Sequence, residues 1–180
     1  VAAIARLPLI EPPEVGDIID GFKLERMLVD GVYSRVFRAR DLKEARMVLM
    51  KFPKPHTIGS ELSARQAFMR ETWVASRVQH IWIGAVLTLP PKRQTCLYIV
   101  QPFYEGETLE RRLLRAPKIS LEEGVDIAIK MAKALGSLHR AGIIHRDIKP
   151  ENIILMPGGG LKLIDLGVAR LPQVAGAEEF

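Results

Sequence analysis

The chain has 180 residues, of which 48% are hydrophobic and 26% charged, a composition typical of a folded soluble protein. Its net charge of +5 comes from lysines and arginines that are scattered rather than interleaved with aromatic residues, which argues against a nucleic-acid-binding protein. The single cysteine, Cys96, excludes a disulfide framework and zinc ligation by a cysteine cluster, and it favours a reducing, cytoplasmic environment.

The first 18 residues contain three of the twelve prolines and little hydrophobic periodicity, so we expect a linker that leads into a domain. They do not resemble a signal peptide, because no continuous apolar stretch precedes a small-residue cleavage site. The longest apolar run, residues 81–89, is about half the length of a membrane-spanning helix and is interrupted by Gly84 and Thr88. We therefore expect a buried strand or loop there and no membrane segment.

A meander of three strands is predicted after this linker, with turn signals at Asp30-Gly31 and at Asp41. Its strands are FKLERML (22–28), SRVFRARD (34–41) and RMVLMKF (46–52). A helix is predicted over residues 61–77. Residues 95–100 are predicted to form a strand that pairs with residues 85–89 across the Pro90-Pro91 turn.

Helical periodicity dominates after Pro102. Residues 120–142 predict a helix with Ser120 and Glu123 as a capping box and Gly142 at its end. Its expected core-facing stripe consists of Leu121, Val125, Ala128, Ala132, Leu135 and Leu138. Residues 152–165 then predict a hairpin with its turn at 157–160. Strands first and helices later indicate an α+β protein in two parts.

Between the long helix and the hairpin lies IIHRDIKPENIIL, residues 143–155, which flanks charged and polar groups with pairs of isoleucines. The isoleucines would anchor the loop in a core while the polar side chains face a cleft. Loops held in this way by rigid elements are where catalytic groups concentrate.

The pattern HRDIKPEN, residues 145–152, closely resembles the catalytic loop of protein kinases. The other landmarks of that family follow in order: Lys51 ends the strand VLMK, Glu71 lies on the next helix, and DLG (165–167) follows the hairpin. Lys149 resembles the serine/threonine kinases rather than the tyrosine kinases. The proline-containing start also resembles bacterial proteins that join a metal-dependent phosphatase domain to a kinase domain.

This resemblance implies a role for each landmark in the transfer of the γ-phosphate of ATP to a protein hydroxyl. Asp147 would accept or orient the proton of the attacking hydroxyl, and Lys149 would lie near the transferring phosphate. Lys51 would bind the α- and β-phosphates, held by an ion pair with Glu71, for which Glu61 is the alternative. His145 is expected to be structural.

Two further sets of residues are expected to hold the cofactors. Asn152 and Asp165 would bind Mg²⁺, or Mn²⁺ in its place, through oxygen atoms. The nucleotide itself would contact Leu28, Gly31, Val36, Lys51, Phe103, Tyr104 and Ile154. In addition, Arg146 would receive a phosphorylated or acidic activation segment.

The sequence also departs from the family at several positions. In the phosphate-covering loop, VDGVYSRV (29–36), only the second of three glycines, Gly31, remains, which weakens backbone contacts to phosphate. Leu49 stands where alanine is usual and narrows the adenine slot. Leu166 replaces the phenylalanine of the Asp-Phe-Gly triplet, but it can still pack.

The implied architecture is the two-lobed kinase fold: a linker (1–18), a small lobe with an antiparallel sheet and one helix (19–101), and part of the helical lobe (102–180). The helical part would contain the hinge, the long helix, the catalytic loop and the metal-binding hairpin. No Ala-Pro-Glu motif occurs, so most of the substrate-binding lobe is expected to be missing and one apolar face of the long helix partly exposed.

Two other functions compete with a serine/threonine kinase. The eroded glycine loop and Leu49 favour a pseudokinase-like scaffold that only binds nucleotide. A small-molecule phosphotransferase could use the same fold, although Lys149 within KPEN argues for a protein substrate. The expected partners are ATP, a protein with serine or threonine, and a fused N-terminal phosphatase domain.

Overall fold

The computed structural model describes residues 6–54, 61–90 and 92–170, with the side chains of 61–64 left out. Its contacts divide the chain into two units: unit 1 is Val1–Thr72 with Ala85–Phe103, and unit 2 is Trp73–Gly84 with Tyr104–Phe180. The expected boundary between residues 101 and 102 differs from this division, since residues 73–84 fold with the later part of the chain.

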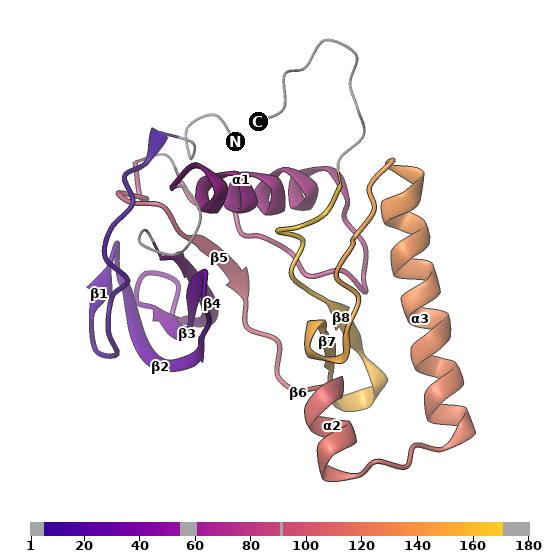
Figure 1. Ribbon diagram of the computed structural model, residues 1–180. Coiled ribbons are helices and arrows are strands. Elements are labelled where there is room, and N and C mark those ends of the chain that lie inside the picture. The colour runs from indigo at the N-terminus through magenta and orange to yellow at the C-terminus, as the bar shows by residue number, and fades with distance from the viewer. Residues whose placement is uncertain (1–5, 55–60, 91, 171–180) are drawn as a thin grey trace. The chain divides into compact units, whose positions relative to one another are not determined.

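Unit 1 is built on an antiparallel sheet whose described strands follow the order β1-β2-β3-β4-β5 (Figure 1). The strands are β1 (Ile18–Ile19), β2 (Phe22–Asp30), β3 (Ser34–Asp41), β4 (Arg46–Pro53) and β5 (Ile99–Pro102). Alternate residues face the core, as a half-buried sheet requires. The apolar side chains on these strands with no exposed surface are Phe22, Leu24, Phe37, Ala39, Val48, Met50 and Phe52. The predicted meander is confirmed.

The predicted pairing of residues 95–100 with 85–89 is wrong. Leu87 N–H donates to the Val100 carbonyl at 2.7 Å, but residues 85–89 form no strand in the described chain. The side-chain amide of Gln94 donates to the carbonyl oxygens of Cys96 and Tyr98, so a side chain satisfies groups that a neighbouring strand would otherwise pair. The strand β5 begins only at Ile99 and pairs with β4. Pro91, in the expected turn, lies outside the described residues.

Helix α1 (Glu61–Arg77) has the bounds that the sequence predicts. Its residues up to Thr72 belong to unit 1, where Phe68 forms a small core with Leu97 and Ile99. Its last turn belongs to unit 2, where Val74 joins a different core. One continuous helix therefore supplies side chains to both units.

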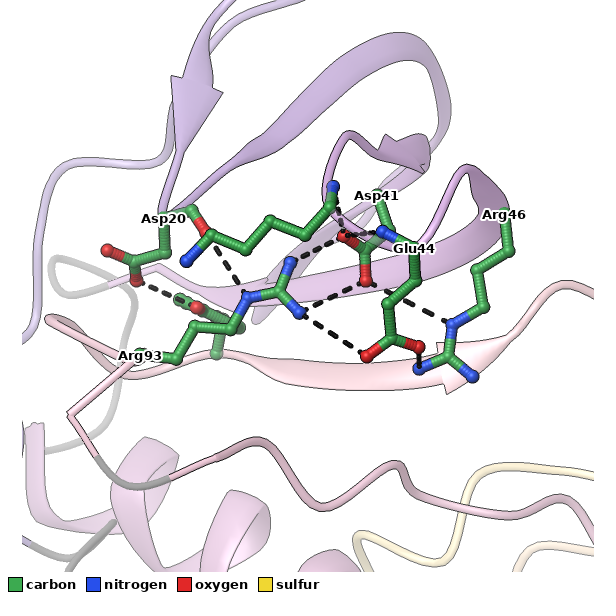
Figure 2. A network of polar contacts seen from close by, with 7 residues as sticks. Asp20, Asp41, Glu44, Arg46 and Arg93 are labelled. Carbon is green, nitrogen blue, oxygen red and sulfur yellow. Dashed lines mark hydrogen bonds and ion pairs between the residues drawn. The ribbon is translucent and has the colours of Figure 1, made fainter.

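A buried ion pair joins two segments of unit 1 that are far apart in sequence (Figure 2). Arg93 donates to both carboxylate oxygens of Asp41, at 2.6 and 3.1 Å, and its guanidinium lies 4.2 Å from the centre of the Phe22 ring. Burial acts to raise the pKa of Asp41, but the hydrogen bonds from Arg93 and from the backbone of Lys43 and Glu44 hold it below its ordinary value. The pair fastens the segment before β5 to the end of β3.

Asp20, in the turn between β1 and β2, makes a second link to the same segment. Its carboxylate accepts hydrogen bonds from the Thr95 backbone and hydroxyl, at 2.9 and 2.8 Å, and from the Tyr98 hydroxyl at 2.7 Å. Cys96 lies between these two residues and is 3% exposed. Burial raises the pKa of the Cys96 thiol to about 11, so the thiol is protonated at neutral pH.

Unit 2 combines two helices with a small antiparallel sheet of order β6-β7-β8. Its elements are β6 (Glu107–Thr108), α2 (Leu109–Arg115), α3 (Leu121–Arg140), β7 (Ile153–Leu155) and β8 (Leu161–Leu163). The predicted hairpin is confirmed as β7 and β8, with Met156 N–H donating to the Gly160 carbonyl at 2.8 Å. The α+β class is also as expected.

Helix α3 has the predicted caps but not the predicted buried stripe. Ser120 Oγ accepts from Glu123 N–H at 3.0 Å, and Gly142 follows the helix with a φ of 73°. Of the expected stripe only Leu138 is fully buried, and Leu121 is 85% exposed. The buried side chains are instead Met131, Ala134 and Leu138, which face the β7–β8 hairpin.

The helix carries apolar residues on more than one face, and periodicity alone selected the wrong one. Val125, at 47% exposed, and Ile129, at 49%, share the outer face with Leu121. Partial exposure of an apolar face of this helix was therefore a correct prediction. In the described chain, no helix has both the length and the apolar character needed to span a membrane.

We predict that Arg93→Leu lowers the free energy of unfolding by about 3–5 kcal/mol, because it leaves Asp41 charged, buried and without its guanidinium. The matched control is Arg46→Leu, which removes a half-exposed arginine that also reaches Asp41, at 4.0 Å. That change should cost less than about 1 kcal/mol. Urea denaturation of the two variants beside the parent checks this, and equal losses in both would contradict it.

Candidate functional site

In unit 1, Glu71 is the acceptor for two side chains from neighbouring strands. Lys51 Nζ lies 3.0 Å from Glu71 Oε2, and Gln101 Nε2 donates to Glu71 Oε1 at 2.8 Å. Glu71 is 2% exposed, so its charge is desolvated and depends on these donors. The geometry brings the two sequence-predicted residues together and adds Gln101, which the sequence analysis missed. A glutamine inside the apolar strand IVQP was the available signal.

The register of β3 and β4 places a set of side chains on one face of the sheet. Val36 is directly opposite Lys51, and Arg38 is opposite Leu49, so all four point to the same side. The Arg38 guanidinium lies 5.6 Å from the centre of the Phe103 ring. This face therefore places two apolar side chains, Val36 and Leu49, beside the cationic groups of Lys51 and Arg38.

Hydrogen bonds and ion pairs at its base hold the loop between β2 and β3. Gly31 N–H donates to the Ser34 carbonyl at 3.0 Å, closing a tight turn. The carboxylate of Asp30 accepts from Arg35 Nε at 3.1 Å and pairs with Lys54 Nζ at 2.5 Å. Hydrogen bonds from Lys54 and Arg35 lower the pKa of Asp30. The tip of the loop remains exposed, as does Leu28 before it.

In unit 2, the Asn152 amide organises the catalytic-loop segment. Asn152 Nδ2 donates to both the carbonyl oxygen and the carboxylate Oδ2 of Asp147, each at 2.9 Å. Lys149 Nζ lies 3.1 Å from the same Oδ2. The hydrogen bond to Asp147 raises the pKa of Lys149, which keeps the ammonium charged. The three side chains form one cluster with Asp147 partly accessible.

Asn152 and Asp165 offer oxygen atoms that suit a hard divalent cation. The hydrogen bonds from the Asn152 side chain to Asp147 both use Nδ2, so the amide is oriented with Oδ1 as the remaining ligand atom. The backbone links the two residues, since Ile164 N–H donates to the Asn152 carbonyl at 2.9 Å. Asp165 itself has a φ of 62°, in the left-handed region.

No group of three or more histidine, cysteine, aspartate or glutamate side chains that could hold a metal occurs among the described residues. A cation at Asn152 and Asp165 would therefore complete its coordination with water or with oxygens of a bound substrate. Magnesium ions commonly bind proteins in this way, through one or two carboxylates and substrate phosphates. The residues present fit such an ion.

His145 supports this loop from inside. It is 1% exposed; its Nδ1 accepts from Asp147 N–H at 3.3 Å, and its Nε2 lies 3.3 Å from the Ile164 carbonyl. These partners fit a neutral ring with the proton on Nε2. Burial lowers the pKa of His145, against the raising effect of the Ile164 hydrogen bond and the nearby carboxylates. A neutral, buried ring agrees with the structural role expected for this residue.

The remaining predicted positions also have defined surroundings. Leu166 is 3% exposed in the core of unit 2, so the leucine packs as expected. Tyr104 lies beneath Lys162, whose ammonium is 5.0 Å from the ring centre, and Ile154 is half-buried on β7. Arg146 is exposed with a φ of 71°. Its expected partner is a phosphorylated or acidic activation segment, and the part of that segment in residues 171–180 lies outside the described residues.

The predicted site residues are divided between the two units. Unit 1 carries the nucleotide-facing set: Leu28, Gly31, Val36, Lys51, Glu71 and Phe103. Unit 2 carries the set around the catalytic loop: Tyr104, Asp147, Lys149, Asn152, Ile154 and Asp165. Lys51 and Glu71 pair within unit 1, and Asn152 and Lys149 both contact Asp147 within unit 2. The roles of these residues remain predictions.

Comparison with known proteins gives one consistent family. The family model described as "Protein kinase domain" matches residues 22–177. The chain is 32% identical over 154 residues to the serine/threonine-protein kinase pkn3 of Myxococcus xanthus, covering 83% of this chain and 28% of that protein. It is 29% identical over 168 residues to the serine/threonine-protein kinase PknA of Mycobacterium tuberculosis, covering 91% and 39%.

A third relative is a probable serine/threonine-protein kinase PknB of Corynebacterium glutamicum, 32% identical over 156 residues, with 85% of this chain and 24% of that protein covered. The chain thus spans less than two fifths of the length of these three relatives. Protein kinases as a family use ATP together with a divalent metal ion.

We predict that His145→Gln flattens the pH dependence of stability. Because the folded-state pKa of His145 is lowered from 6.5, the unfolded chain binds its proton more readily. The stabilisation is complete above the unfolded value and is lost as the pH falls through the lower folded value.

Urea denaturation at about pH 7.5 and about pH 5 measures this effect. The parent should lose more stability between these values than the variant. The exposed His139, replaced by glutamine, serves as a control that should keep the parent's slope. Parallel slopes for the parent and the His145 variant would contradict the prediction.

Proposed function

The chain belongs to the protein kinase family, and from this premise we propose that it is the ATP-binding and catalytic part of a serine/threonine protein kinase. The reaction is transfer of the γ-phosphate of MgATP to a serine or threonine hydroxyl of a protein. The observation that carries this proposal is the cluster in which Asn152 and Lys149 both contact the carboxylate of Asp147. The names of the relatives support the serine/threonine class.

Unit 1 would supply the nucleotide-binding half. Lys51 would contact the α- and β-phosphates, and its ion pair with the buried Glu71 keeps the ammonium at a fixed place on the sheet. Val36, on the same face as Lys51, would cover the adenine together with Leu28. Gly31 would let the loop backbone approach the phosphates, and Phe103 would offer backbone groups to the base.

Unit 2 would supply the reacting half. Asp147 would orient the substrate hydroxyl and accept its proton, with the amide of Asn152 holding the carboxylate in place. Lys149 would neutralise charge on the transferring phosphate as a point charge. Mg²⁺ would bind Asn152 Oδ1 and the Asp165 carboxylate, and Mn²⁺ could replace it because both ions accept oxygen ligands. Tyr104 and Ile154 remain predicted contacts of the nucleotide.

A nucleotide-binding scaffold is the second candidate, and the loss of two glycines from residues 29–36 favours it. Against it, a scaffold has no chemical need for a carboxylate held by both an amide and an ammonium group. A small-molecule phosphotransferase is less well supported, since Lys149 lies where protein kinases of the serine/threonine class carry it. The fused N-terminal phosphatase domain stays a prediction from the first residues alone.

We predict that the natural polypeptide containing this chain transfers labelled γ-phosphate from MgATP to serine or threonine. Asp147→Asn should reduce this transfer by at least about a hundredfold, because the amide cannot accept the hydroxyl proton. Phosphoamino-acid analysis of the labelled product identifies the acceptor residue. Nucleotide binding without transfer in the parent would favour the scaffold instead.

We also predict that Lys51→Met weakens ATP binding much more than adenosine binding. The lysine would contact phosphates, whereas adenosine has none, so only the ATP affinity depends on its charge. The expected loss is about tenfold or more for ATP, as for the removal of one charge-assisted contact, and little for adenosine. Calorimetric titration of both ligands measures it. Equal losses would mean that Lys51 does not contact phosphate.

A further inference from the structure

Residues 6–14, called here the N-terminal strap, lie against unit 1 instead of leaving it as a bare linker. Leu7 and Leu9 are partly buried and pack against the small core formed by Phe68 of α1 with Leu97 and Ile99. This core lies between the helix and the sheet. The strap therefore closes an apolar layer to which α1 contributes.

Two hydrogen bonds fix the strap on either side of this layer. Leu97 N–H donates to the Pro8 carbonyl at 2.8 Å, and Arg65 of α1 donates from its guanidinium to the Leu7 carbonyl at 2.8 Å. The first bond holds the strap to the segment before β5, and the second reaches it from the helix. A short length of backbone thus bridges the sheet and α1.

The far end of the strap is held as well. Arg35 of β3 contacts Glu14 Oε1 at 2.7 Å and the Pro12 carbonyl at 3.4 Å, while Ile10 packs against the main core of unit 1. With one end attached to β3 and the other to α1 and the segment before β5, the strap has a defined position from which to restrain the helix.

The residues of α1 that meet the strap share one side of the helix with the residue that meets Lys51. Arg65, Phe68 and Glu71 follow one another at intervals of three, so each lies beside the next on the helix surface. Arg65 contacts the strap, Phe68 packs with Leu7 and Leu9, and Glu71 pairs with Lys51. A displacement of α1 away from the strap would therefore disturb the Lys51–Glu71 pair.

We propose that the N-terminal strap is a positioning element for the reaction, which holds α1 where Glu71 reaches Lys51. The effect is indirect, because the strap meets α1 at Arg65 and Phe68, which precede Glu71 on the helix. This inference rests on the proposed kinase function for its kinetic consequence, but not for its structural one. Loss of the strap would leave the sheet folded and release the helix.

The test uses the natural polypeptide with Leu7→Ser and Leu9→Ser together. The matched control is Val15→Ser, a similar loss of apolar side chain just beyond the strap at a residue that is 53% exposed. Phosphate transfer gives kcat and KM for ATP. Hydrogen exchange of residues 65–77 reports on α1, and exchange of the β2–β4 strands shows whether the sheet is intact. Arg65→Gln, which removes the guanidinium contact to the Leu7 carbonyl, is a milder second variant.

The double serine variant should lower kcat between about tenfold and a hundredfold, the usual effect of small misplacement of catalytic groups. It should also speed exchange in α1 but not in the sheet, with Arg65→Gln intermediate and Val15→Ser unchanged. In a Glu71→Gln background the strap change should cost less than about twofold more, because the interaction that it supports is already gone.

Additive losses in that double-variant cycle would overturn the proposal, since they would show that the strap acts independently of Glu71. Unchanged kcat and unchanged α1 exchange in the double serine variant would also overturn it. If the parent transfers no phosphate, the proposed function fails, and α1 exchange alone then decides: faster exchange supports the strap, and unchanged exchange refutes it.

Discussion

The buried carboxylate of Glu71 is the constraint on which unit 1 depends. An ionised group that is 2% exposed must be paired, because its desolvation costs several kcal/mol when it is not. Its partners come from two strands, Lys51 from β4 and Gln101 from β5, so the strands must be in register and α1 must lie over them. The apolar layer formed by Phe68 with Leu97 and Ile99 also holds α1 in this position. Packing and electrostatics thus specify one position for the helix.

Much of the fold was predictable because its signals are local. The bounds of α1, the cap at Ser120 and the β7–β8 hairpin follow from periodicity, side-chain oxygen atoms and turn residues within a few positions. The buried face of α3 was not predictable in this way, since the helix has two apolar faces and only the hairpin, far along the chain, selects one. The extended pairing of residues 85–89 failed because the side chain of Gln94 took over the hydrogen bonds that a strand would have made.

The candidate site likewise contains residues that a local motif predicts and residues that depend on contacts between distant parts of the chain. A contiguous motif placed Asp147, Lys149 and Asn152 together, and the structure shows how the Asn152 amide joins them. Gln101 was missed because it lies in a strand with no motif of its own, 30 residues from its acceptor. The prolines of the N-terminal strap predict only a linker. Proline lacks a donor but keeps its carbonyl oxygen, and Pro8 uses that atom to accept a hydrogen bond from Leu97, in the segment before β5.

The single cysteine, Cys96, is a native probe of how often unit 1 opens. The Cys96 side chain is buried in unit 1. In sequence it lies between Thr95 and Tyr98, which both donate to Asp20, and directly before Leu97, whose N–H donates to the Pro8 carbonyl of the strap. The thiolate is the form that attacks alkylating reagents, and this thiol is both buried and protonated. Covalent labelling therefore requires unit 1 to open and expose the thiol, so the labelling rate reports how often unit 1 opens. Mass spectrometry of the labelled Cys96 sulfur can thus follow the opening of unit 1 without an engineered probe.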